Sequence, residues 1–267
     1  MTTPPPPIPV PSYVNPIDNL RDRSENTARN LCIGLGILFA LAFACSVVGG
    51  LIVLGLSFIY WILTFLMAAS IKGGAVQVTA KSWPELNAIV DDAKNKLGVS
   101  DAKAYVIQDS VFNAFATRLA GRNFVILNSG AIDTLLRKGK IEDLKFLVGH
   151  ECGHVAMGHV GFWNTTFAHL GAIIYPLYAW YRRCQERSAD RCGLWCAGNR
   201  TDAHRSIAAL ASGAEMGSRL DINAVSAQWN EVRDETWIMI ARYYSEYPHT
   251  LERILLVHQA ADELRLP

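Results

Sequence analysis

The sequence predicts a mainly helical α+β domain with a small β-sheet, preceded by two apolar helices that are long enough to cross a membrane. Three observations lead to this prediction. Residues 31–71 contain no charged side chain, residues 104–128 contain short runs of strand character, and residues 83–97 have the spacing of an amphipathic helix. A chain of 267 residues can hold one such domain, at 72–267, together with its appendages.

Residues 1–30 are expected to form a disordered, proline-rich tail. Prolines stand at positions 4–7, 9, 11 and 16, and the segment has little apolar surface to bury. A polar, basic stretch follows these prolines, unlike the apolar run of a cleaved signal peptide.

The uncharged residues 31–71 are too many for one membrane crossing. At about 1.5 Å per residue, a single helix would greatly exceed the ~30 Å hydrocarbon core of a bilayer. We therefore expect two transmembrane helices, at about 31–47 and 51–71, which turn at Gly49-Gly50.

Basic residues flank this pair on both sides. Arg21, Arg23 and Arg29 precede the first helix, and Lys72 and Lys81 follow the second. Positive flanks mark the cytoplasmic side of a membrane segment. A transmembrane hairpin would therefore place both flanks, and the domain that follows, in the cytoplasm.

The composition indicates which partners and which cellular compartment to expect. The formal net charge of +1 gives no indication of a nucleic-acid partner. The six cysteines lack the spacing of a disulfide framework, so we expect free thiols. This usage fits a domain in a reducing compartment.

The domain begins with a helix and a small sheet. The apolar stripe of the helix at 83–97 consists of Leu86, Ile89, Val90, Ala93 and Leu97. Strands are predicted at about 104–108, 114–119 and 124–128, and a turn rich in polar residues joins the last two as a hairpin. Helices are expected at 131–136 and 141–159.

Residues 162–181 are rich in aromatic side chains but contain Asn164, His169 and Pro176. The segment is too short to add two further membrane spans. We expect one helix here, and two alternatives stay open: the helix is membrane-associated, or it packs on the domain. The remainder, 201–266, is predicted to be largely helical.

The strongest functional signal is the pattern His-Glu-x-x-His at 150–154. Residues four apart lie above one another on a helix, so His150 and His154 can offer two imidazole nitrogens to one metal ion. Glu151 could take a proton from a water molecule that the metal activates. This pattern is the signature of zinc proteases, with the glutamate as general base.

The third ligand must come from another part of the chain. A continuation of the motif to a third histidine fails, because Met157 and Val160 stand where glycine and histidine are required. Glu186 is the candidate from a second helix. Asp190, one turn further on, could accept the outer N–H of a ligand histidine.

These motifs resemble the HtpX-like and CAAX-prenyl-endopeptidase-like membrane zinc metallopeptidases. The resemblance extends over about 75–256 and is carried by the segments Asn113–Ala116, Val125–Gly130, Glu142–His154 and Glu186–Asp190. It implies a zincin-type domain of the gluzincin class that binds Zn²⁺ and cleaves protein or peptide substrates. It also implies a multi-pass protein of a bacterial inner membrane, with the catalytic domain in the cytoplasm.

The resemblance further suggests which residues hold the substrate. In gluzincins an extended peptide pairs with a sheet edge beside the metal, and either Asn113–Leu119 or Phe124–Asn128 is the candidate edge here. Among these, Asn113, Ala114, Phe115 and Ala116 are the expected substrate-binding residues. An alternative for Asn113 is that it only turns the chain into the strand.

A residue that assists the oxyanion is harder to assign. Related enzymes carry a His-Pro pair before an Arg-Ile pair, whereas this chain has Tyr247-Pro-His249 before Arg253-Ile. Tyr247 takes the place of the histidine, and His249 is displaced by two positions. Either side chain could donate a hydrogen bond to an oxyanion, and a helix start with an incidental histidine is the alternative.

The sequence therefore favours a membrane-anchored zinc endopeptidase over two rivals. A non-catalytic, metal-stabilised scaffold or chaperone-like adaptor would not need Glu151. A prenyl-protein processing enzyme would need more membrane spans than this chain supplies. The sequence does not identify the substrate, and a role in membrane-protein quality control is one possibility. A homo-oligomer and a complex with another membrane protein are both compatible with the sequence.

Overall fold

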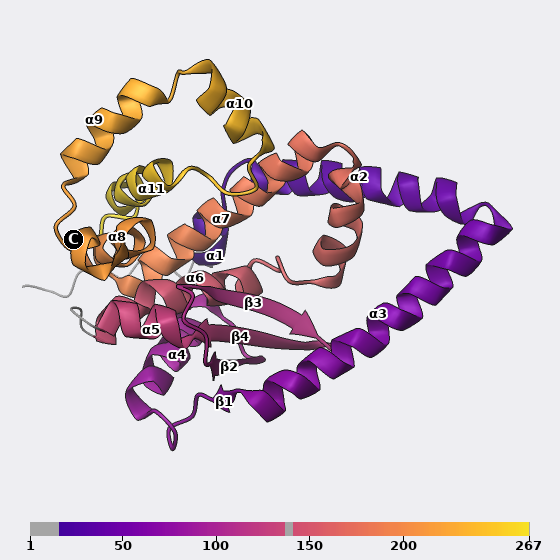
Figure 1. Cartoon of the computed structure of the whole chain (residues 1–267), viewed down its shortest axis with the longest axis horizontal. Coiled ribbons are helices and arrows are strands. Elements are labelled where there is room, and N and C mark those ends of the chain that lie inside the picture. The colour runs from indigo at the N-terminus through magenta and orange to yellow at the C-terminus, as the bar shows by residue number, and fades with distance from the viewer. Residues whose placement is uncertain (1–15, 137–140, 267) are drawn as a thin grey trace, which may run out of the picture.

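The computed structural model describes residues 16–136 and 141–266 and consists mainly of helices packed around one small sheet (Figure 1). The prediction of a mainly helical α+β domain is confirmed at this level. Residues 1–15, the first half of the expected proline-rich tail, lie outside the described residues.

The sheet has four strands in the order β1-β2-β4-β3. Strands β1 (Val76–Gln77), β2 (Ala102–Ile107), β3 (Ala114–Leu119) and β4 (Arg122–Asn128) pair antiparallel except for β2 and β4, which are parallel. Strand β3 therefore lies at an edge and β4 in the interior. The alternative that Phe124–Asn128 forms a substrate-binding edge was wrong, because β4 is paired on both sides.

The middle of strand β4, residues 124–127, is apolar because both faces of the strand are covered. Val125 and Leu127 pack into the main core beneath α4 (Pro84–Leu97), whose predicted apolar stripe is buried. Phe124 and Ile126 pack on the other face, against the end of the long helix α3 (Val47–Gly74). A continuous apolar run is expected for a strand buried on two sides.

The two N-terminal apolar helices meet at an acute angle at one tip of the molecule (Figure 1). They are α2 (Glu25–Ala44) and α3 (Val47–Gly74), and each is long and apolar enough to cross a membrane. The predicted turn at Gly49-Gly50 was wrong. The chain turns at Cys45–Ser46, where the Ser46 side chain accepts a hydrogen bond from the Gly49 N–H.

Part of the expected tail is folded. Residues 16–20 form α1 (Pro16–Leu20), and the first turn of α2 begins at Glu25 instead of near residue 31. Leu20 and Glu25 are both fully buried. The polarity of this segment suggested a solvated tail, but the acid and its neighbours find partners inside the domain.

The segment at 162–181, predicted as one helix, is not one helix. It contains a π-helical turn, η2 (Asn164–Ala168), and a 3₁₀ turn, η3 (Gly171–Ile173), before α7 (Tyr175–Ala197) begins. Both turns pack on α2, where Gly36 faces the Phe167 carbonyl and Gly171 faces the backbone at Cys32. A side chain at either glycine would separate the two segments.

Two helices form the centre of the domain and lie very close together. They are α6 (Leu144–Ala156), preceded by the short helix η1 (Ile141–Asp143), and α7 (Tyr175–Ala197). A Cβ atom on Gly153 would come within 2.6 Å of the Cys192 Cβ, and one on Gly149 within 2.5 Å of the Cys196 Cβ. The bare backbone of α6 thus allows this approach.

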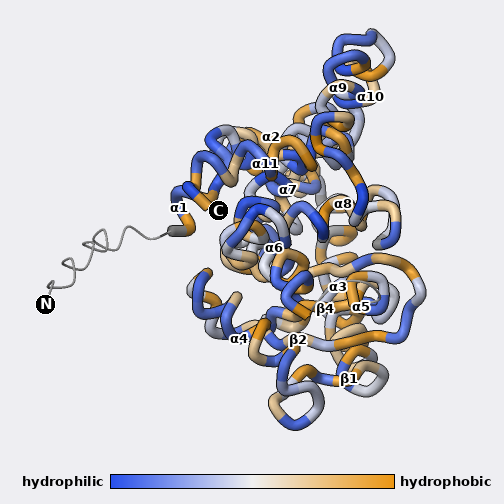
Figure 2. The backbone as a smooth tube through the Cα atoms, turned by 90° about the vertical axis from the view of Figure 1, so that its left-hand side faces the viewer, coloured by the Kyte–Doolittle hydropathy of each residue, from blue (hydrophilic) through white to orange (hydrophobic). Residues whose placement is uncertain are grey.

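The remaining helices follow the central pair. Helix α5 (Ser129–Leu136) leaves the sheet, and α8 (Arg200–Gly217), α9 (Ile222–Val232), α10 (Thr236–Tyr244) and α11 (Thr250–Glu263) complete the chain. Helix α11 returns to pack against α7 and α8. Helices α9 and α10 project from the body of the molecule (Figure 2).

Candidate metal centre

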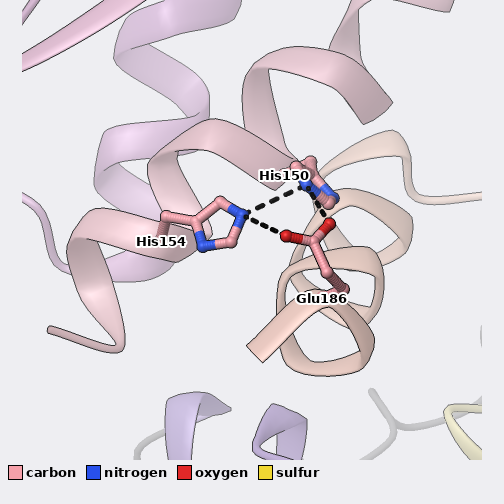
Figure 3. Close-up of side chains that lie close together, drawn as sticks. All are labelled: His150, His154 and Glu186. Atoms are coloured by element: carbon pink, nitrogen blue, oxygen red, sulfur yellow. Dashed lines mark hydrogen bonds and ion pairs between the residues drawn. The ribbon is translucent and has the colours of Figure 1, made fainter. Parts of the chain in front are cut away.

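Three side chains from the two central helices converge on one point (Figure 3). The Nε2 atoms of His150 and His154, one turn apart on α6, are 3.2 Å from each other. Glu186 on α7 places its two carboxylate oxygens 3.6 Å from His150 Nε2 and 3.7 Å from His154 Nε2. The structure thus brings together the three ligands that the motifs suggested.

These separations match the size of a zinc site. A tetrahedral ion with bonds of about 2.0–2.2 Å separates its ligand atoms by roughly 3.3–3.6 Å. Two imidazoles and one carboxylate are also the donor set of catalytic zinc sites that keep a fourth position open. Such an ion fits the residues present without moving them far.

The electrostatics of the cluster keep Glu186 charged. Burial alone would favour the neutral acid, but the hydrogen bond with His150 and the nearby histidines and Arg253 hold the pKa of Glu186 well below its usual range. Burial also lowers the pKa of His154. For His150, the hydrogen bonds to Asp190 and Glu186 outweigh burial and raise the pKa to about 10.

Asp190 supports His150 from behind. Its Oδ1 atom lies 3.0 Å from the His150 Nδ1 atom, which leaves Nε2 free to face the metal position. Arg253, from α11, donates two hydrogen bonds to this carboxylate, at 2.9 and 2.7 Å. Burial opposes ionisation of Asp190, but Arg253 and His150 lower its pKa. In the sequence, Arg253 was used only to align Tyr247 and His249 with the His-Pro pair of related enzymes, so its contact with Asp190 was not predicted.

Glu151 lies on the same helix as the two histidines, at the wall of a cavity. It is buried and accepts a hydrogen bond from the Ala116 N–H of strand β3. Burial raises the pKa of Glu151 to about 7, with His150 opposing the shift. A carboxylate with a pKa near neutrality is suited to take up and release a proton.

The cavity has a volume of about 540 Å³ and lies between β3, α6 and α7. The cavity is lined by Asn113, Ala114, Phe115 and Ala116, and also by Tyr247. His249 is not among the lining residues. The centroid of its ring lies 5.8 Å from that of Trp229 instead, although the neighbouring Pro248 and Thr250 line the cavity.

One further histidine was missed in the sequence. His159 lies beyond the end of α6, and its Nδ1 atom is 2.8 Å from the Nδ1 atom of His154. It is one position out of register with the longer histidine motif, so the spacing gave it no role. Only the geometry shows that it touches a candidate ligand.

Parts of the chain are similar to known proteins. The model of the family described as Peptidase family M48 matches residues 80–165. The Protease HtpX homolog of Streptococcus mutans is 26% identical over 129 residues, 47% of this chain and 42% of that protein. That of Streptococcus gordonii is 34% identical over 82 residues, 31% and 27% of the two chains.

These matches cover only part of each protein. A Protease HtpX homolog of Streptococcus pneumoniae is 26% identical over 125 residues, 45% of this chain and 41% of that protein. The chain thus spans less than half the length of these curated relatives. No solved structure matches the chain.

The family match includes both histidines and Glu151 but ends before Glu186, so the third candidate ligand rests on the sequence pattern of the second helix and on the geometry. Over the segment that carries the His-Glu-x-x-His motif, the resemblance of this chain to the HtpX-like M48 metallopeptidases is confirmed.

Proposed function

We propose that this protein is a membrane-anchored zinc endopeptidase that hydrolyses peptide bonds of protein substrates. The observation that carries the proposal is the convergence of His150, His154 and Glu186 on one point, beside a buried Glu151 that faces the same cavity. The match to a peptidase family supports it. Each residue of this set has a role in peptide hydrolysis.

His150, His154 and Glu186 would hold the ion. When bound there, zinc would polarise the scissile carbonyl and make a neighbouring water molecule more acidic. Glu151 would accept the proton of that water and then deliver it to the leaving amine nitrogen. Tyr247, which lines the cavity, is the proposed donor to the oxyanion.

The decisive experiment separates metal binding from proton transfer. In the purified full chain, Glu151→Gln should keep its zinc and lower the cleavage rate of an unfolded peptide by about 10²–10⁴-fold. Glu142→Gln, an acid outside the cavity lining, is the matched control and should cleave normally. Metal content and peptide cleavage are both measured on the same preparations.

The rival, a non-catalytic metal-stabilised scaffold or chaperone-like adaptor, predicts a different outcome. Under that hypothesis, wild-type protein and Glu151→Gln would hydrolyse peptide equally slowly, and removal of zinc would change only the unfolding temperature. Such a result would reject the endopeptidase.

The substrate would bind along the free edge of β3. The Ala116 N–H donates a hydrogen bond to Glu151, so the main-chain groups of Ala116 point away from β4. Alternate residues of an antiparallel strand face the same way, so the main-chain groups of Ala114 and Arg118 also point to the edge. A peptide could add there as a further strand.

Ala114→Pro tests this docking edge without touching the contact between Ala116 and Glu151. The substitution removes one main-chain donor at the start of the strand, where proline is tolerated. We expect a higher KM for extended peptides with zinc content unchanged, and Ala114→Gly as control should bind substrate nearly normally. An unchanged KM in Ala114→Pro would exclude β3 as the docking edge.

We also propose that α2 and α3 cross a bacterial inner membrane as a hairpin, with the catalytic domain in the cytoplasm. Their length and apolar composition support this, together with the basic residues on both flanks. Arg23→Cys and Lys81→Cys should be labelled by an impermeant thiol reagent only from the cytoplasmic side. The natural Cys45, exposed at the turn between the helices, should be labelled only from the opposite side. Labelling of Arg23→Cys and Lys81→Cys from opposite sides would exclude the hairpin.

A further inference from the structure

A buried chain of polar side chains connects the metal centre to the first turn of helix α2. The Nδ1 atom of His154 lies 2.8 Å from the Nδ1 atom of His159. The Nε2 atom of His159 in turn lies 3.2 Å from the Oε1 atom of Glu25. His159 is 5% exposed and Glu25 is not exposed at all, so water does not complete these contacts.

The hydrogen bonds of this chain have only one consistent direction when His154 binds a metal ion through Nε2. A neutral imidazole that uses Nε2 as a ligand carries its proton on Nδ1. His154 Nδ1 therefore donates to His159 Nδ1, which must be unprotonated. His159 then carries its proton on Nε2 and donates to Glu25, which accepts only.

Glu25 is fixed at the end of this chain by other donors. Arg21, one turn earlier, pairs with its Oε1 atom, and the Ser188 hydroxyl of α7 donates to its Oε2 atom. Arg21 also donates to the Met157 carbonyl at the end of α6, at 3.2 Å. The carboxylate is thus held in one position relative to both ligand helices.

A purely structural role for this cluster is the main alternative. Buried ionic groups often serve only to fix the packing of two segments. Yet a second pair already ties the same segment to α7: Arg187 Nε donates to Asp22 at 2.7 Å, and Ser188 accepts from the Asp22 N–H. What distinguishes the Glu25 cluster is its contact, through His159, with a metal ligand.

We propose that His159 and Glu25 are positioning residues that fix the ring orientation and the tautomer of His154, so that helix α2 supplies part of the support of the metal centre. The proposal rests on the zinc site put forward above. It gives α2 a role beyond anchoring, because a residue of its first turn determines how one ligand is presented.

The test measures zinc affinity in the detergent-solubilised full chain by competition with a chelator. His159→Ala should raise the dissociation constant for zinc by about 10–100-fold, the usual size of the loss in affinity when the partner of a ligand histidine is removed. His159→Gln, whose side-chain oxygen can still accept from His154, should recover part of the affinity. If His159→Ala fails to fold, the Gln variant still allows the measurement.

A double-variant experiment distinguishes positioning from packing. Because Glu25 is proposed to act through His159, Glu25→Gln should weaken zinc binding several-fold in the wild-type background and should have no further effect in His159→Ala. A merely structural Glu25 would have the same effect in both backgrounds. That outcome would overturn the proposed role of Glu25.

Asp22→Asn is the matched control. It removes the negative charge of the half-buried partner of Arg187 from the same segment, so it should lower the unfolding temperature without changing zinc affinity. His150→Ala serves as the reference for the site itself. If His150→Ala loses zinc while His159→Ala keeps wild-type affinity, only the present inference fails. If His150→Ala keeps its zinc, the proposed metal site is wrong.

Discussion

The two candidate histidine ligands lie one turn apart on the same helix, yet their supports are built differently. His150 is backed directly by a carboxylate, Asp190, which Arg253 of α11 holds in a two-pronged contact. His154 is backed by a second imidazole, His159, and reaches a carboxylate only at the next step. One support comes from the C-terminal helix and the other ends on α2.

The comparison shows how the centre depends on the whole chain. The candidate ligands occupy a short stretch of α6 and one position of α7, but the supports behind the two histidines, through His159 and Asp190, end at residues 25 and 253. A direct carboxylate increases the basicity of its histidine more than a neutral imidazole does, because the full negative charge is adjacent. Burial lowers the pKa of both histidines, but only for His150 do the hydrogen bonds with Asp190 and Glu186 outweigh it, so the pKa is raised for His150 and lowered for His154.

The largest expected effect comes from removing both supports together. If they act independently, Asp190→Asn combined with His159→Ala should weaken zinc binding by the product of the single effects, about 10²–10⁴-fold. Zinc titration of the four proteins of this cycle, with a fluorescent chelator as competitor, measures the coupling. A double variant no weaker than the worse single variant would mean that the two supports form one unit.

Asp190→Asn alone tests which support matters more. The amide keeps the shape of the side chain but loses the negative charge next to His150. We expect a loss of zinc affinity of about 10–100-fold. The loss should exceed that in Glu25→Gln, where an imidazole separates the charge from the ligand. The reverse order, measured by the same competition assay, would contradict the comparison.

The smallest effect is a difference in protons released on zinc binding. At pH 8 His150 should carry a proton before the metal arrives, because its pKa is raised to about 10, whereas His154, with a lowered pKa, should not. The number of protons released on binding should therefore be larger at pH 8 than well above pH 10 by about one, because an acidified water would contribute equally at both pH values. Calorimetry in buffers of different ionisation enthalpy measures these numbers. A difference of about two protons would mean that both histidines start charged.

The sequence was most informative where local pattern determines structure. The apolar stripe of 83–97 became α4, and the strand predicted at 114–119 has the bounds of β3. The ligand triad followed from a helical spacing and a second acidic helix. In each of these cases the period of the residues and the chemistry they can perform agree.

Other features had no local signal. Glu25 appeared to be one more charge at the border of an apolar segment, and nothing in its neighbours indicates a partner 134 positions away. The two-residue strand β1 is too short for any period to be visible. The turn between α2 and α3 was misplaced because glycine was taken as a turn residue. Gly49 instead lies in the first turn of α3, where it packs on the end of α2.

The closeness of α6 and α7 has a consequence for how related sequences should be compared. Gly149 and Gly153 lie on the side of α6 that touches Cys196 and Cys192, away from the ligand atoms. With Cys192 and Cys196 in place, a larger residue at either glycine would push the two helices apart and move Glu186 away from the two histidines. The small residues behind the motif are therefore as necessary for the convergence of the three side chains as the motif itself, and a search that scores only His-Glu-x-x-His overlooks them.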